Sequence, residues 1–120
     1  MRDIRCRGKS IYTDRWVTGY YIGTGTLCKY GDEHYSVDDD TVGQFTGLFD
    51  KNGNRIYEGD ILRHFDGSEH PDIGRVFWDA KYCGWRRTTG AEAVDTYRLS
   101  GNCVYEVIGN IHDNPELIPC

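Results

Sequence analysis

The sequence lacks the short cysteine spacings that zinc sites and redox motifs use. It contains five cysteines, an odd number, and none of them forms a CxxC pair. A disulfide framework or a zinc site is therefore disfavoured, and free thiols in a reducing compartment are favoured. The five cysteines are Cys6, Cys28, Cys83, Cys103 and Cys120.

Long hydrophobic runs are also missing. No uninterrupted apolar stretch approaches the roughly 18 residues that a membrane-spanning helix needs, and the first residues, MRDIRCRGK, have no apolar core of a signal peptide. From these absences we expect a soluble cytoplasmic protein without contact to a membrane.

Alanine is scarce, whereas glycine and aromatic residues are abundant. The 120 residues include 15 glycines, nine tyrosines, four phenylalanines and three tryptophans. Aromatic residues favour strands, and glycine favours turns. A chain of this length suits one domain with one core, so we expect a single mainly β domain over residues 1–120.

The charge balance disfavours general binding to nucleic acid. The net charge is −5, and phosphate backbones are bound chiefly by lysine and arginine. The charges are unevenly spread, since residues 1–17 are locally basic and residues 18–72 are acidic. The sequence thus leaves nucleic acid as a secondary possibility.

The clearest local pattern is the segment TVGQFTGLFDKNGNRIYEGDI at residues 41–61. Its two β-prone arms, 42–49 and 55–57, flank an Asn-Gly pair that is typical of hairpin turns. We also expect a turn at residues 38–41, where aspartate oxygens can accept backbone N–H groups, and one helical turn near Pro115. Further strands are predicted at 16–22, 34–37, 61–65, 74–79, 85–87, 97–99 and 104–108.

These elements predict a small curled antiparallel sheet or an SH3-like, partly open barrel of short strands, ending in a short helical turn. Four blocks of sequence carry a family resemblance: residues 7–22, 41–61, 74–79 and the ending YEVIGNIHDNPELI at 105–118. In this order they resemble the YopX-like family of phage and prophage proteins. The resemblance implies a mainly β phage or prophage protein, and it brings no catalytic or ligand residues.

Candidate chemistry in the sequence is weak. Asp50, Asn52 and Asn54 imitate the start of a calcium loop, but the glycine and glutamate expected later are replaced by Arg55 and Ile61. The four histidines lack the spacing of metal ligands. Cys83 could act as a nucleophile only if a histidine lay near it in the fold. We therefore expect no catalytic, cofactor or metal site.

One stretch combines aromatic and basic residues in the manner of a binding surface. Aromatic side chains beside guanidinium groups are common both at protein interfaces and on surfaces that bind single-stranded nucleic acid. The tryptophans could equally face each other across a hairpin as part of the core. The candidate partner-binding patch consists of Arg75, Trp78, Lys81, Tyr82, Trp85, Arg86 and Arg87.

The sequence thus predicts a non-enzymatic accessory protein that binds a host or phage protein. The alternative is a small β-barrel that binds single-stranded nucleic acid through Trp78, Trp85 and the neighbouring cations. A metal-dependent hydrolase built from the scattered histidines ranks below both. A homo-oligomer is compatible with the sequence, because a second subunit can cover an exposed strand edge.

Overall fold

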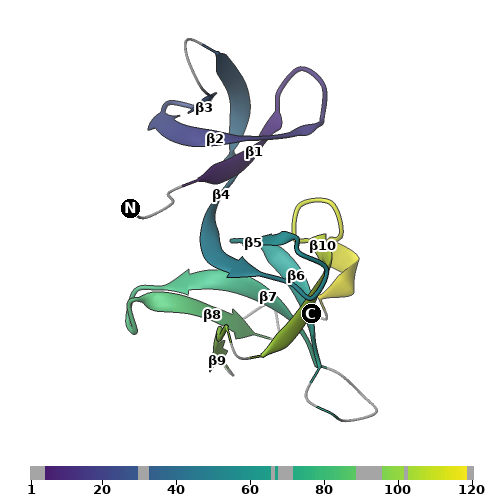
Figure 1. The fold of residues 1–120 in the computed structure, drawn as a ribbon. Coiled ribbons are helices and arrows are strands. Elements are labelled where there is room, and N and C mark those ends of the chain that lie inside the picture. Colours follow the sequence, from purple (N-terminus) through teal and green to yellow (C-terminus); the bar gives the residue numbers. More distant parts are fainter. Residues whose placement is uncertain are drawn as a thin grey trace. The chain divides into compact units, whose positions relative to one another are not determined.

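The computed structural model describes residues 5–29, 33–65, 67, 72–88, 96–101 and 103–118. Within them the chain forms ten strands and one 3-10 turn (Figure 1). It divides into two compact units, Met1–Phe45 and Thr46–Cys120. The strands are β1 (Cys6–Ser10), β2 (Trp16–Gly23), β3 (Thr26–Cys28), β4 (His34–Phe49), β5 (Arg55–Tyr57), β6 (Asp60–Phe65), β7 (Asp72–Asp79), β8 (Gly84–Thr88), β9 (Thr96–Arg98) and β10 (Val104–Asn110), followed by the turn η1 (Pro115–Leu117).

The strand pairings of the first unit close on themselves. β1 pairs with β2, β2 with β3, and β3 with the start of β4, while β4 also pairs with β1. Inside this ring lie the buried side chains of Cys6, Leu27 and Val37, with Val17 and Val42 packed against them. The ring leaves β1 without a free edge, so a strand with few apolar residues is still held on both sides.

β4 is a continuous strand of 16 residues, so the turn predicted at residues 38–41 is wrong. The register between β1 and β4 shifts here, with Arg7 opposite Gly43 but Lys9 opposite Asp38. The local bonds that favoured a turn do form, since the Asp40 N–H donates to Oδ1 of Asp38 at 3.1 Å. They stabilise a bulge in the strand because β1 and β3 hold the backbone on either side.

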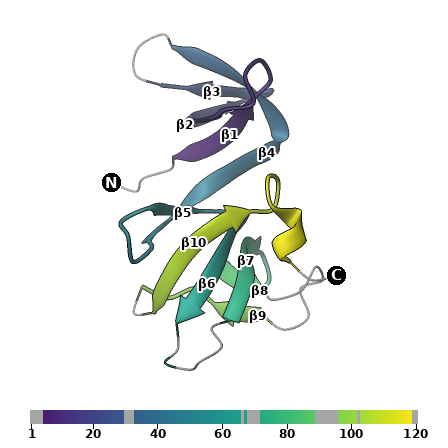
Figure 2. The ribbon, with the colours of Figure 1, turned by 90° about the vertical axis from the view of Figure 1, so that its right-hand side faces the viewer.

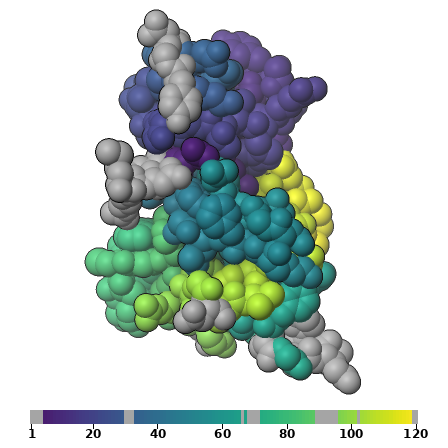
Figure 3. Space-filling model, viewed as in Figure 1, coloured from purple at the N-terminus to yellow at the C-terminus, as the bar shows by residue number. Residues whose placement is uncertain are grey.

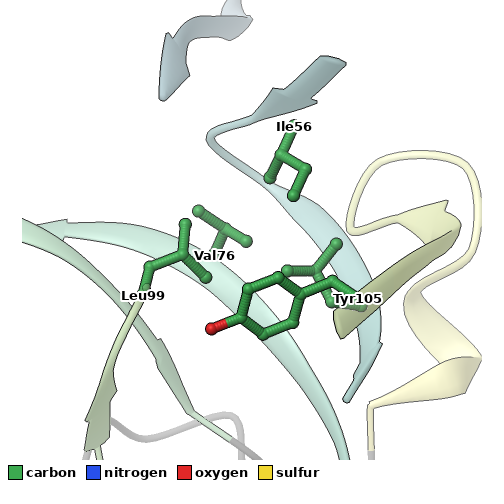
Figure 4. Packing of buried hydrophobic residues seen from close by; sticks show 5 residues of the cluster. Ile56, Val76, Leu99 and Tyr105 are labelled. Atoms are coloured by element: carbon green, nitrogen blue, oxygen red, sulfur yellow. The ribbon is translucent and has the colours of Figure 1, made fainter. Parts of the chain in front are cut away.

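The second unit contains a five-stranded antiparallel sheet in the order β10-β6-β7-β8-β9. Figure 2 shows β10, β6 and β7 side by side. The buried cluster of this unit contains Ile56, Leu62, Val76, Leu99 and Tyr105, and Figure 4 shows how these side chains converge from different strands. The Tyr105 hydroxyl accepts the Ser100 N–H at 3.1 Å, which satisfies a polar group at the margin of the cluster.

The predicted Asn-Gly hairpin forms between β4 and β5, and its turn is organised by Asp50. Oδ1 of this carboxylate accepts the N–H groups of Asn52 at 2.9 Å and Asn54 at 2.8 Å. Oδ2 accepts the Val107 N–H at 3.1 Å and the Asn54 side-chain amide at 3.3 Å. The acidic side chain thus ties the turn to β10, which explains the calcium-like spacing as backbone capping.

The C-terminal segment is shaped by Asn110. Its Oδ1 accepts the N–H groups of His112 at 3.0 Å and Asp113 at 2.9 Å, while its own N–H donates to Asn114. Pro115 then begins η1, as the sequence predicted. The expected class, mainly β with curled antiparallel sheets and a short C-terminal helical turn, is confirmed.

Candidate functional site

The seven residues of the predicted patch lie in the β7–β8 hairpin, but on different sides of it. In the register, Trp78 is opposite Trp85 and Val76 is opposite Arg87. Successive residues of a strand point to opposite faces, so the adjacent Arg86 and Arg87 cannot lie on the same face of the sheet. Trp78, Trp85 and Arg87 share the face that carries the core, Arg75 and Arg86 lie on the other face, and Lys81 and Tyr82 lie in the turn.

The two tryptophans face each other across the hairpin, which was one of the two interpretations of the sequence. Their rings are 5.1 Å apart in an edge-to-face arrangement. Trp85 packs against the buried cluster, whereas Trp78 keeps 42% of its surface exposed. One tryptophan therefore belongs to the margin of the core and the other to the surface.

Arg87 is not available to a partner. Its side chain is only 7% exposed, and its Nη2 donates to Nδ1 of His64 at 2.9 Å. Its guanidinium carbon also lies 4.9 Å from the centre of the Tyr97 ring, and Nη1 is 4.0 Å from Oδ2 of Asp72. These contacts place Arg87 and His64 in the support of the sheet.

Arg86, whose side chain is only 18% exposed, supports the exposed ring of Tyr82. The Arg86 guanidinium donates from Nε to Oγ1 of Thr96 at 2.9 Å and from Nη2 to its backbone oxygen at 3.1 Å. The same group lies 4.5 Å from the centre of the Tyr82 ring and 3.9 Å from the Asp79 carboxylate. Tyr82 is 58% exposed, so a fixed cation holds an aromatic ring at the surface.

An open cavity of about 590 Å³ lies beside these residues, within the second unit. We call it the β8–β9 cavity. Leu48, Leu99 and Trp85 give it apolar walls. Figure 3 shows the green surface of the β7–β8 hairpin and the yellow-green surface of the chain near residue 100 on one face of this unit. The full lining is Thr46, Leu48, Tyr82, Cys83, Gly84, Trp85, Arg86, Arg98, Leu99 and Gly101.

Three of the predicted patch residues line the cavity, namely Tyr82, Trp85 and Arg86. The other lining residues were not indicated by the sequence. The most important addition is Arg98, an exposed cation at the end of β9. Alternation along Tyr97-Arg98-Leu99 would have shown that Arg98 and Leu99 face different ways. Nothing local indicates that Leu48, distant in the sequence, completes the wall.

The other candidate groups of the sequence are accounted for differently. Cys83 is exposed in the β7–β8 turn at a φ of 50°, with Sγ 3.5 Å from the Ala80 oxygen. Among the described residues, no three His, Cys, Asp or Glu side chains are grouped so that they could hold a metal ion. His70 lies outside the described part of the chain.

The fold and the cavity define a small β protein with an open, mixed aromatic and basic surface site. The family model for the YopX protein matches residues 9–119, so the chain belongs to the YopX family. The crystal structure of protein EF1440 from Enterococcus faecalis is similar, with 20% sequence identity and a TM-score of 0.58. The match covers 99% of this chain and 100% of EF1440, and at this identity it shows a shared fold.

No curated protein matches the chain. In the described ranges, no helix combines the length and the apolar character that crossing a bilayer would need.

Proposed function

We propose that this protein is a non-catalytic protein-interaction module of a bacteriophage or prophage, and that the β8–β9 cavity is its binding site. The observation that carries the proposal is the cavity itself. It combines apolar walls, an exposed tyrosine held by Arg86, and the exposed Arg98. Tyrosine, tryptophan and arginine in a recessed site are the residues that dominate binding energy at protein interfaces.

Single-stranded nucleic acid is the alternative partner, and the geometry supports it less. A stacking surface needs open aromatic faces beside available cations. Here Arg87 is buried, Arg86 is held by Thr96 and Asp79, and Trp85 packs against the core. Only Trp78 and Tyr82 of the predicted aromatic set are well exposed.

The test compares capture by the tagged protein and by its Tyr82→Ser variant from a nuclease-treated bacterial lysate. Tyr12→Ser is the matched control, because Tyr12 is 80% exposed in the first unit. We expect a partner protein whose affinity, measured with the purified pair by calorimetry, falls about tenfold in Tyr82→Ser and stays unchanged in Tyr12→Ser. Circular dichroism checks that both variants fold.

Equal capture by all three proteins would contradict a site at the cavity. Partners that disappear after nuclease treatment, together with a tryptophan fluorescence change on adding oligonucleotides at low salt, would favour the nucleic-acid alternative.

A further inference from the structure

β9 is an edge strand, and its hydrogen bonds to β8 show which of its backbone N–H and C=O groups point away from the sheet. It stands last in the order β10-β6-β7-β8-β9, and the Leu99 N–H donates to the Trp85 oxygen at 3.1 Å. In an antiparallel pair, successive residues direct their backbone groups alternately toward and away from the partner strand. The N–H and C=O of Arg98 therefore point away from β8, toward the edge with which no other described strand pairs.

The neighbouring residue agrees with this assignment. Thr96 has the same parity as Arg98, and its backbone oxygen accepts the Arg86 side chain at 3.1 Å instead of a bond from β8. For Arg98, no such bond to the backbone groups occurs among the residues that the structure describes. An unpaired strand edge is a template to which another strand can add.

The cavity lies beside this edge and is lined by Arg98 and Leu99 themselves. A strand added along β9 would place alternate side chains toward the cavity. At about 590 Å³, with Leu48, Trp85 and Leu99 as walls, the cavity has room for a large apolar side chain. Main-chain bonds and a side-chain pocket together constitute recognition by strand addition.

The charges at the site indicate which side chains an added strand should carry. Arg86 lies 3.9 Å from the Asp79 carboxylate, whereas Arg98 forms no ion pair with any described residue. An exposed guanidinium favours a carboxylate, which it can bind through two parallel hydrogen bonds. Within the sheet Arg98 already lies opposite Arg86. A second copy paired with its own Arg98 at this position would add a further guanidinium, and like charges across strands are destabilising.

We propose that the β8–β9 cavity receives an extended, acidic segment of a partner protein. The segment adds to β9 as a further strand, inserts one aromatic or branched apolar side chain into the cavity, and presents an Asp or Glu to Arg98. This assignment rests on the proposed function and specifies its partner.

The test selects binders from a displayed library of random heptapeptides with the full-length protein. We expect selected peptides to carry an aromatic or branched residue with an Asp or Glu within two positions. Arg98→Glu should weaken a selected synthetic peptide at least tenfold, whereas Arg15→Glu, the same charge change at an exposed turn of the first unit, should not. Methylation of single backbone amides in that peptide should reveal at least one position where binding falls tenfold or more.

Any of the following results would overturn the inference: no selected peptide, peptides without enriched carboxylates, or binding insensitive to Arg98→Glu and to every amide methylation. A dimer in sedimentation experiments that excludes peptide would assign the edge to a second copy and would also overturn it. The proposed function fails separately, when partner capture does not depend on Tyr82. A partner that depends on Tyr82, but whose binding is weakened neither by Arg98→Glu nor by any amide methylation, would keep the interaction module and reject strand addition.

Discussion

Replacing Asp50 with asparagine should lower the free energy of unfolding by about 3 kcal/mol at neutral pH. The Asp50 side chain is buried and accepts four hydrogen bonds, two on each carboxylate oxygen. An asparagine offers one acceptor oxygen, and its NH₂ group would face two N–H donors left without partners. One of those donors is the Val107 N–H, so the link between the turn and β10 would be lost.

The effect of this substitution should depend on pH. Burial acts to raise the pKa of Asp50, but hydrogen bonds from the backbone N–H groups of Val107, Asn54 and Asn52 outweigh it and hold the pKa below its ordinary value. A carboxylate with a lowered pKa stabilises the fold above its unfolded pKa of about 3.9, and that stabilisation is lost as pH falls through the folded value. The difference between the wild type and Asp50→Asn should therefore shrink below about pH 4.

Urea titrations at pH 7 and at pH 3, followed by tryptophan fluorescence, would measure both differences, because Trp78 and Trp85 belong to the same unit as Asp50. Asp14→Asn is the control, because Asp14 is exposed in a turn at a φ of 57°, which asparagine tolerates. A difference that stays constant from pH 7 to pH 3 would show that the carboxylate charge is not what stabilises the turn.

The second large effect is expected for Gly74→Ala, which should destabilise the protein by about 2–3 kcal/mol. Gly74 is buried in β7, and a Cβ added there would lie 2.9 Å from the backbone oxygen of Thr88. The obstructing atom belongs to the backbone of β8, so it cannot be relieved by rotating a side chain. β7 and β8 would have to move apart.

Gly84→Ala, in the neighbouring strand, is the matched control for Gly74→Ala. A Cβ at Gly84 would meet its nearest atom, the Tyr82 oxygen, at an ordinary 3.7 Å. We expect a change within about 0.5 kcal/mol at this position. Equal urea midpoints for the two alanine variants would refute the close contact as the reason for glycine at position 74.

The strands that the sequence predicted well carry their signals locally. The hairpin around Asn52 and Gly53 follows from turn chemistry, and η1 follows from Asn114 and Pro115. By contrast, β1 and β3 were missed. β1 reads CRGKS, with little alternation, and it is a strand because β2 and β4 pair with it on both sides. Such pairing over long sequence distances leaves no local pattern.

The candidate site was predictable only in part for a similar reason. The cavity is lined by three patch residues that are close in sequence, Tyr82, Trp85 and Arg86. Strand alternation places Arg87 on the opposite face from Arg86, where it contacts His64. The sequence could have shown that separation, because adjacent strand residues always face opposite ways. It could not show that Leu48 and Arg98 meet at the same cavity, because that depends on how the sheet curls.

The continuity of β4 limits how this protein can be divided or recombined. The boundary between the units, after Phe45, falls inside a strand, and β4 pairs with β1 and β3 in its first part and with β5 near its end. Exchange of segments between related chains is best tolerated in exposed loops, where few backbone bonds are broken. A crossover at this boundary would join two halves of one hydrogen-bonded strand, so hybrids that keep residues 34–49 from a single parent should yield more folded protein than hybrids joined at position 45.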